Sequence, residues 1–90
     1  MSLQEKCEAI NEIVGAYFSI NKSVTCIQAC DLYKDNQGMR NLFSSEKTMR
    51  DVFRKLDELN TLNDIPYLQK SEIGGGRRNW FFIRKNEYNV

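Results

Sequence analysis

Apolar residues recur at helical spacing through the first twenty residues of the chain. This pattern predicts one long amphipathic helix over about residues 3–20. The residues of the predicted buried stripe are Leu3, Cys7, Ile10, Val14 and Tyr17, widened by Ala9, Ile13, Ala16 and Ile20. Gly15 lies inside this helix, where glycine costs about 1 kcal/mol relative to alanine. We therefore interpret Gly15 as a point of close packing.

A second, shorter helix is predicted over about residues 24–33. Asn21-Lys22-Ser23 interrupts the first pattern, and Ser23 or Thr25 can cap the helix that follows. The residues expected to face inward are Cys26, Ile27, Cys30 and Tyr33. A turn-rich and then semi-apolar segment, residues 34–43, is expected to link this helix to the next one.

The third predicted helix covers about residues 45–60. Its inward residues, again at helical spacing, are Met49, Val52, Phe53, Leu56 and Leu59. Ser44 or Ser45 can cap its start, and Glu46 is favourably placed near the positive end of the helix dipole. Asn60 is expected to end it in a left-handed conformation.

The last third of the chain predicts a β-hairpin over about residues 65–85. Residues 65–73 form the first strand, starting near Pro66, Gly74–Gly76 permit the turn, and residues 79–84 form the return strand. Because strand residues alternate between faces, either Trp80 and Phe82 or Phe81 and Ile83 should cover the helices. The outward set is available to a dimer partner, another protein or, less favoured, stacked single-stranded bases.

Length and composition indicate one α+β domain spanning residues 1–90. The chain has 90 residues, with 28% charged and 41% apolar, as in water-soluble globular domains. It contains no apolar run near the roughly 20 residues of a membrane span and no signal-peptide core at its start. We therefore expect a cytoplasmic protein without a membrane partner.

Charge is unevenly distributed, although the net charge is only +1. Residues 1–38 carry −2 and residues 39–90 carry +3. The first helix has acids on its polar face, whereas the third helix begins its exposed side with Lys47, Arg50 and Arg54. Positive potential is therefore expected on the second half of the chain, where an anionic partner would bind.

The chain offers little for metal binding or catalysis. It contains no histidine, and its cysteines, Cys7, Cys26 and Cys30, match no common zinc spacing. We interpret them as reduced cysteines of the core. The glycine run lies between strands and is not a phosphate-binding loop of the strand-to-helix type. We expect no enzymatic activity, no cofactor and no metal.

The order of three helices and a two-stranded hairpin with a basic glycine tip resembles the winged helix-turn-helix domain. The most specific part is Ser45-Glu46-Lys47-Thr48-Met49-Arg50, which is similar to the start of recognition helices in bacterial and phage regulators. The resemblance covers residues 3–85. The chain departs from the family in the ten-residue link at 34–43 and in having no glycine after the third helix.

The resemblance implies sequence-specific binding of double-stranded DNA by a small transcriptional or phage/plasmid regulator. The third helix would then enter the major groove and the hairpin, over residues 74–79, would lie on the backbone or in the minor groove. The DNA-binding residues implied on the helix are Ser44, Ser45, Lys47, Thr48, Arg50, Asp51 and Arg54, and those on the hairpin are Arg77, Arg78 and Asn79.

Each of these assignments has a simpler alternative. The helix face can be a solvated charged surface, with ion pairs such as Arg50–Asp51 or Arg54–Glu58. For Arg77 and Arg78 we favour an anion contact, because adjacent arginines repel each other and the nearest acid along the chain is Glu72. A protein-interaction module on the same fold, without DNA binding, is the alternative function, and a homodimer stays open.

Overall fold

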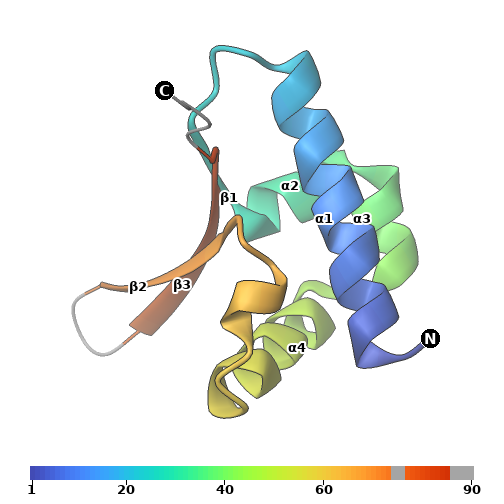
Figure 1. Ribbon diagram of the computed structural model, residues 1–90, viewed down its shortest axis with the longest axis vertical. Helices are drawn as coiled ribbons and strands as arrows, with labels where there is room; N and C mark the ends of the chain where they lie inside the picture. Colours follow the sequence, from blue (N-terminus) through green and yellow to red (C-terminus); the bar gives the residue numbers. More distant parts are fainter. Residues whose placement is uncertain (74–76, 86–90) are drawn as a thin grey trace.

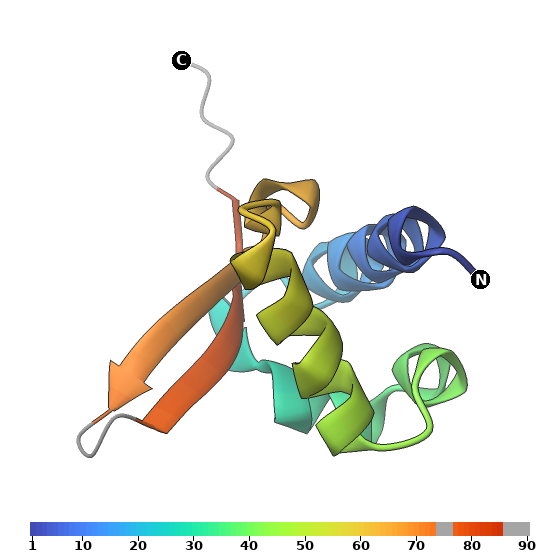
Figure 2. The same cartoon turned by 90° about the horizontal axis from the view of Figure 1, so that it is seen from below.

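The computed structural model describes residues 1–73 and 77–85, without the side chains of residues 72, 73, 77 and 78. Within these residues the chain is α+β, with four α-helices and a three-stranded antiparallel sheet. The elements are α1 (Leu3–Ile20), β1 (Cys26–Gln28), α2 (Ala29–Asp35), α3 (Gln37–Leu42), α4 (Glu46–Glu58), the 3₁₀ helix η1 (Leu62–Asp64), β2 (Leu68–Ile73) and β3 (Arg77–Ile83). The helices lie on one side of the sheet in both views (Figures 1 and 2).

The predicted first helix is confirmed as α1, with a capping box at its start. The Ser2 side chain accepts a hydrogen bond from the Glu5 N–H, and the Glu5 carboxylate accepts one from the Ser2 N–H. Its fully buried residues are Cys7, Ile10, Val14 and Phe18. The predicted stripe was wrong at its end, because the spacing from Val14 continues to Phe18 and leaves Ala16 and Ile20 exposed.

Gly15 is a point of close packing, as predicted. A Cβ atom at this position would lie 3.1 Å from the hydroxyl oxygen of Tyr67. Tyr67 precedes β2, so the missing side chain of Gly15 lets α1 approach the segment that enters the sheet.

The predicted helix over residues 24–33 is wrong in its first half. Residues 26–28 form β1, which pairs antiparallel with β3 through Cys26–Ile83, Ile27–Phe82 and Gln28–Phe81. The run Val24-Thr25 and Ile27 is β-branched, which favours extended backbone over helix. The helix starts only at Ala29 and has no side-chain cap, so neither Ser23 nor Thr25 caps it.

The predicted link at residues 34–43 contains a further helix, α3. The Asn36 side chain accepts a hydrogen bond from the Met39 N–H at 3.0 Å and thereby caps it. Asparagine is common both in turns and at helix N-caps, and the hydrogen bond to Met39 shows that Asn36 is a cap. Met39 itself is fully buried. The hydroxyl of Tyr33 donates to the carbonyl oxygen of Phe43 at 3.1 Å and ties the end of this segment to α2.

The third predicted helix is confirmed as α4, with Ser45 as its N-cap. Met49, Phe53 and Leu56 are buried, but Leu59 is 50% exposed and was wrongly expected inside. Asn60 has φ of 58°, the left-handed conformation expected of it. The Thr61 N–H donates to the Leu56 carbonyl at 2.8 Å, and the Asn60 N–H to the Asp57 carbonyl at 3.0 Å. Together these bonds form a Schellman motif.

The predicted hairpin is part of a larger sheet with strand order β1-β3-β2. Its first strand starts at Leu68 and not near Pro66, and its return strand starts at Arg77 and not at Asn79. Trp80 and Phe82 are the inward pair and pack on Phe53, with ring centroids 5.5 and 6.0 Å away. Phe81 is half-buried and Ile83 exposed on the other face, so the choice between the two sets is resolved.

One core of buried side chains joins all the helices to the sheet. It includes Ile10 of α1, Leu32 of α2, Met39 of α3, Phe53 of α4 and Phe82 of β3. Among the described residues, none of the helices has the length and apolar character needed to cross a membrane.

Candidate nucleic-acid interface

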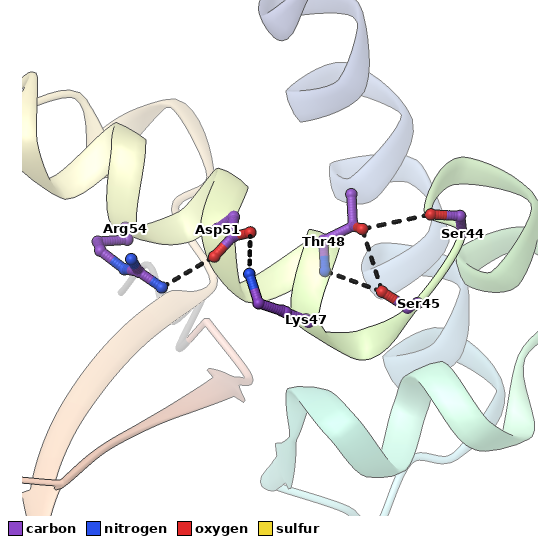
Figure 3. A network of polar contacts seen from close by, with 6 residues as sticks. All are labelled: Ser44, Ser45, Lys47, Thr48, Asp51 and Arg54. Carbon is purple, nitrogen blue, oxygen red and sulfur yellow. Dashed lines mark hydrogen bonds and ion pairs between the residues drawn. The ribbon is translucent and has the colours of Figure 1, made fainter.

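The exposed side of α4 carries a three-residue ionic network. The Asp51 carboxylate accepts a hydrogen bond from Lys47 Nζ at 3.1 Å through one oxygen and from Arg54 Nη2 at 2.8 Å through the other (Figure 3). The side chains of Lys47, Asp51 and Arg54 are 76, 43 and 58% exposed. They lie opposite the buried Met49, Phe53 and Leu56, as the helical spacing requires. We call these three residues the Asp51 network.

The ion pairs differ from those considered as the alternative to DNA binding. Asp51 pairs with Lys47 and Arg54, whereas the Arg50–Asp51 and Arg54–Glu58 pairs are replaced by these contacts. Arg50 lies 3.7 Å from Glu46, measured between Nη1 and Oε1, which is too long for a hydrogen bond. Of the three predicted basic residues, Arg50 therefore has the weakest ion pair, although its side chain is the least exposed at 47%.

The serines and threonine at the start of α4 are engaged with one another. Ser45 Oγ accepts from the Thr48 N–H at 3.1 Å, and the hydroxyls of Ser44 and Ser45 lie 3.3 and 3.0 Å from the Thr48 hydroxyl (Figure 3). Because Ser45 serves as the cap, its hydroxyl oxygen is already used. Ser44 and Thr48 remain exposed and half-exposed, respectively, beside the N-terminus of the helix.

A small cleft brings two predicted site residues together from distant parts of the chain. Arg50 of α4 and Asn79 of β3 both line it, and its volume is about 110 Å³. The other lining residues are Gln28, Ala29, Cys30, Glu46, Met49 and Trp80. Gln28 accepts a hydrogen bond from the Cys30 thiol at 3.4 Å. The sequence offered no reason to place Gln28 here, because residues 24–33 were expected to be one helix.

The hairpin residues Arg77 and Arg78 begin β3 and do not form part of the turn. The strand register places Arg77 opposite Ile73 and Arg78 opposite Glu72. Glu72, the nearest acid along the chain, is therefore directly across the strands from Arg78. The Arg77 and Arg78 side chains and the turn predicted at Gly74–Gly76 lie outside the described residues.

An ion pair fixes the hairpin against α4. Lys70 Nζ of β2 donates to Asp57 Oδ2 at 2.6 Å, and the two side chains are 36 and 21% exposed. Lys70 lies opposite Trp80 in the strand register, on the face toward α4. Asp57 therefore has a structural role, because its carboxylate ties β2 to the end of α4.

A second, wider groove lies between the start of α1 and the segment after α4. Its lining residues are Leu3, Gln4, Cys7, Glu8, Leu59, Thr61 and Asp64. Burial raises the pKa of the Cys7 thiol, and the charges of Asp64 and Glu8 raise it further. The thiol is therefore held in its protonated, unreactive form. The acids that rim this groove disfavour phosphate groups.

The cysteines are all free, but only Cys7 is in the core. Cys26 is exposed on β1 and Cys30 is half-buried, so the expectation that all three are core residues was wrong. Across the described part of the chain, His, Cys, Asp and Glu side chains form no group of three that could hold a metal ion.

Comparison of the chain with protein-family models, with curated proteins and with solved structures gives no significant match.

Proposed function

We propose that the protein binds double-stranded DNA through a winged helix-turn-helix domain, with α4 in the major groove and the β2–β3 hairpin on the adjacent backbone. The arrangement of helices and antiparallel sheet is consistent with this layout. The additional helix α3 occupies the link in which the chain departs from the family's sequence pattern. As a DNA-binding regulator the protein would act without a cofactor.

The observation that carries the proposal is that α4, at Arg50, and β3, at Asn79, line one cleft. Arg50 comes from the helix and Asn79 from the hairpin, so a duplex lying along α4 reaches both elements. The Asp51 network extends the same helix face away from the cleft. Lys70 and Asp57 hold the hairpin in place, which preserves the spacing between the two contact regions.

Arg50 is the residue best placed to read a base. Its long contact with Glu46 is easily exchanged for a stronger one, and a guanidinium can pair bidentately with guanine O6 and N7. Such a pair contributes about 1–3 kcal/mol of discrimination against the wrong base. Contacts of Lys47 and Ser44 with phosphate oxygens would then fix the register without reading sequence.

The test is retention of random-sequence duplex at low and high salt, followed by selection of preferred sites. Retention at low salt with steep release at higher salt is expected, because phosphate contacts release counterions. Arg50→Ala should broaden the selected sequences and weaken specific binding. The matched control is Lys22→Ala, which removes a positive charge from the loop between α1 and β1, at the opposite end of the molecule from α4 (Figure 1).

The alternative function is a protein-interaction module without DNA binding. The groove between α1 and the end of α4 favours it, because Leu59 is half exposed there between the acidic residues Glu8 and Asp64. A basic, partly apolar peptide would fit that surface. Failure of the wild-type protein to retain any duplex at low salt would refute DNA binding and favour this alternative.

A further inference from the structure

Asp51 occupies the centre of the surface that the proposed function turns toward DNA. Lys47 lies one helical turn before it and Arg54 one turn after it, and each binds a different oxygen of the carboxylate (Figure 3). A single acidic side chain therefore restrains two cations at once. Since the network carries two positive charges and one negative charge, its net charge is only +1.

This arrangement has a consequence for any duplex that approaches α4. Phosphates and guanine can bind the N–H groups of Lys47 and Arg54 that Asp51 leaves free, because an ammonium has three donors and a guanidinium has five. The Asp51 carboxylate, whose side chain is 43% exposed, is then brought close to the anionic duplex. An ionised carboxylate only accepts hydrogen bonds, so a base edge that faces it must present a donor.

We propose that Asp51 determines which duplexes the protein accepts, by requiring an exocyclic amino group in the major groove opposite its carboxylate. Cytosine N4 and adenine N6 supply such a donor, whereas guanine N7 and O6 and thymine O4 present acceptors that repel a carboxylate. The inference rests on the proposed function and names the class of site: a duplex with cytosine or adenine at one position facing Asp51, flanked by partners for Lys47 and Arg54.

The variant that tests the proposal is Asp51→Ala, which frees both cations and removes the acceptor. Alanine is a better helix former than aspartate, so α4 is retained. The matched control is Glu58→Ala, which removes one negative charge from an exposed residue at the far end of the same helix. Both variants and the wild-type protein are compared by site selection from a random duplex pool and by titration with one random-sequence duplex at several salt concentrations.

Wild-type protein should enrich cytosine or adenine at one position, and Asp51→Ala should lose this preference while Glu58→Ala retains it. Asp51→Ala should also bind the random duplex more tightly. The slope of log affinity against log salt should steepen by about one to two, because up to two further phosphates are neutralised. If Asp51→Ala keeps the wild-type base preference, the inference is wrong. DNA binding still stands in that case if the wild-type protein retains the duplex at low salt. If neither protein holds DNA at low salt, the proposed function and the inference both fail.

Discussion

Replacement of Arg84 by methionine should strongly destabilise the fold. Arg84 follows β3, and its guanidinium donates to three backbone carbonyls: Nε to Val24 at 2.9 Å, and Nη2 to Phe18 and Asn21 at 2.8 Å each. Its charge also lies over the Phe18 ring, 5.0 Å from the centroid. One side chain therefore joins the end of the sheet to the C-terminus of α1 and the loop that enters β1.

The size of the effect follows from these donors. A hydrogen bond from a charged donor contributes about 1.5–3 kcal/mol when its partner is otherwise left unsatisfied. The three bonds do not add fully, because Arg84 is half exposed and the Asn21 carbonyl also accepts from the Val24 N–H. We expect a net loss of about 2–4 kcal/mol. For a domain of this length that corresponds to a fall in Tm of roughly 10–25 °C.

Thermal unfolding followed by circular dichroism measures this effect. Methionine keeps an apolar stem against Phe18, so the change in Tm reports mainly on the lost hydrogen bonds. Arg84→Lys should recover only part of the loss, since one ammonium cannot reproduce the guanidinium fork. The control is Lys85→Met at the exposed neighbouring position. If Arg84→Met lowers Tm by less than about 4 °C, equivalent to about 1 kcal/mol, the three hydrogen bonds of Arg84 do not stabilise the fold as proposed.

Two further predictions concern the ends of the helices. Asn60→Ala should lower the free energy of unfolding by about 1 kcal/mol, because alanine is strained at the φ of 58° after α4. Asn60→Gly should not lower it. If urea unfolding shows the same loss of stability for the two variants, the prediction is wrong. The pKa of Glu5 lies below its ordinary value of 4.5, chiefly because the Ser2 N–H donates to its carboxylate. Glu5 therefore contributes stability that is fully present above the unfolded pKa and is lost as pH falls through the folded pKa. The Tm difference between wild type and Glu5→Gln should be constant near neutral pH and shrink below about pH 4.5. A gap that persists in acid would refute the contribution of the ionised carboxylate.

Long periodic segments were predictable from the sequence, and short segments with mixed signals were not. The helix α4 has strong spacing, a serine cap and an asparagine end signal, so local chemistry alone specifies it. The segment 26–28 contains apolar residues compatible with either helix or strand. The β-branched Val24, Thr25 and Ile27 favour extended backbone, but the pairing with β3, more than fifty residues later, is what makes the segment a strand.

The candidate site was likewise predictable from the sequence only in part. The residues exposed on α4 could be assigned from helical spacing, but their ion-pair partners could not. Asp51 can reach Lys47 four residues before it, Arg54 three residues after it, or neither, and side-chain packing selects among these. The cleft that joins Arg50 to Asn79, with Gln28 beside them, exists only because β1 lies next to β3. No reading of the separate segments reveals that proximity.

The low net charge of α4 bears directly on how DNA binding would work. A helix with unpaired lysines and arginines binds any duplex, because affinity then follows the number of phosphates neutralised. Here two of the three predicted basic residues already share one carboxylate, and the third is only loosely held by Glu46. Asp51 and Glu46 would therefore weaken the attraction of this helix face for phosphates, and base contacts would have to supply more of the affinity. Such a helix would bind an arbitrary duplex weakly. Its affinity for a particular duplex would depend on base identity at the positions facing Arg50 and Asp51.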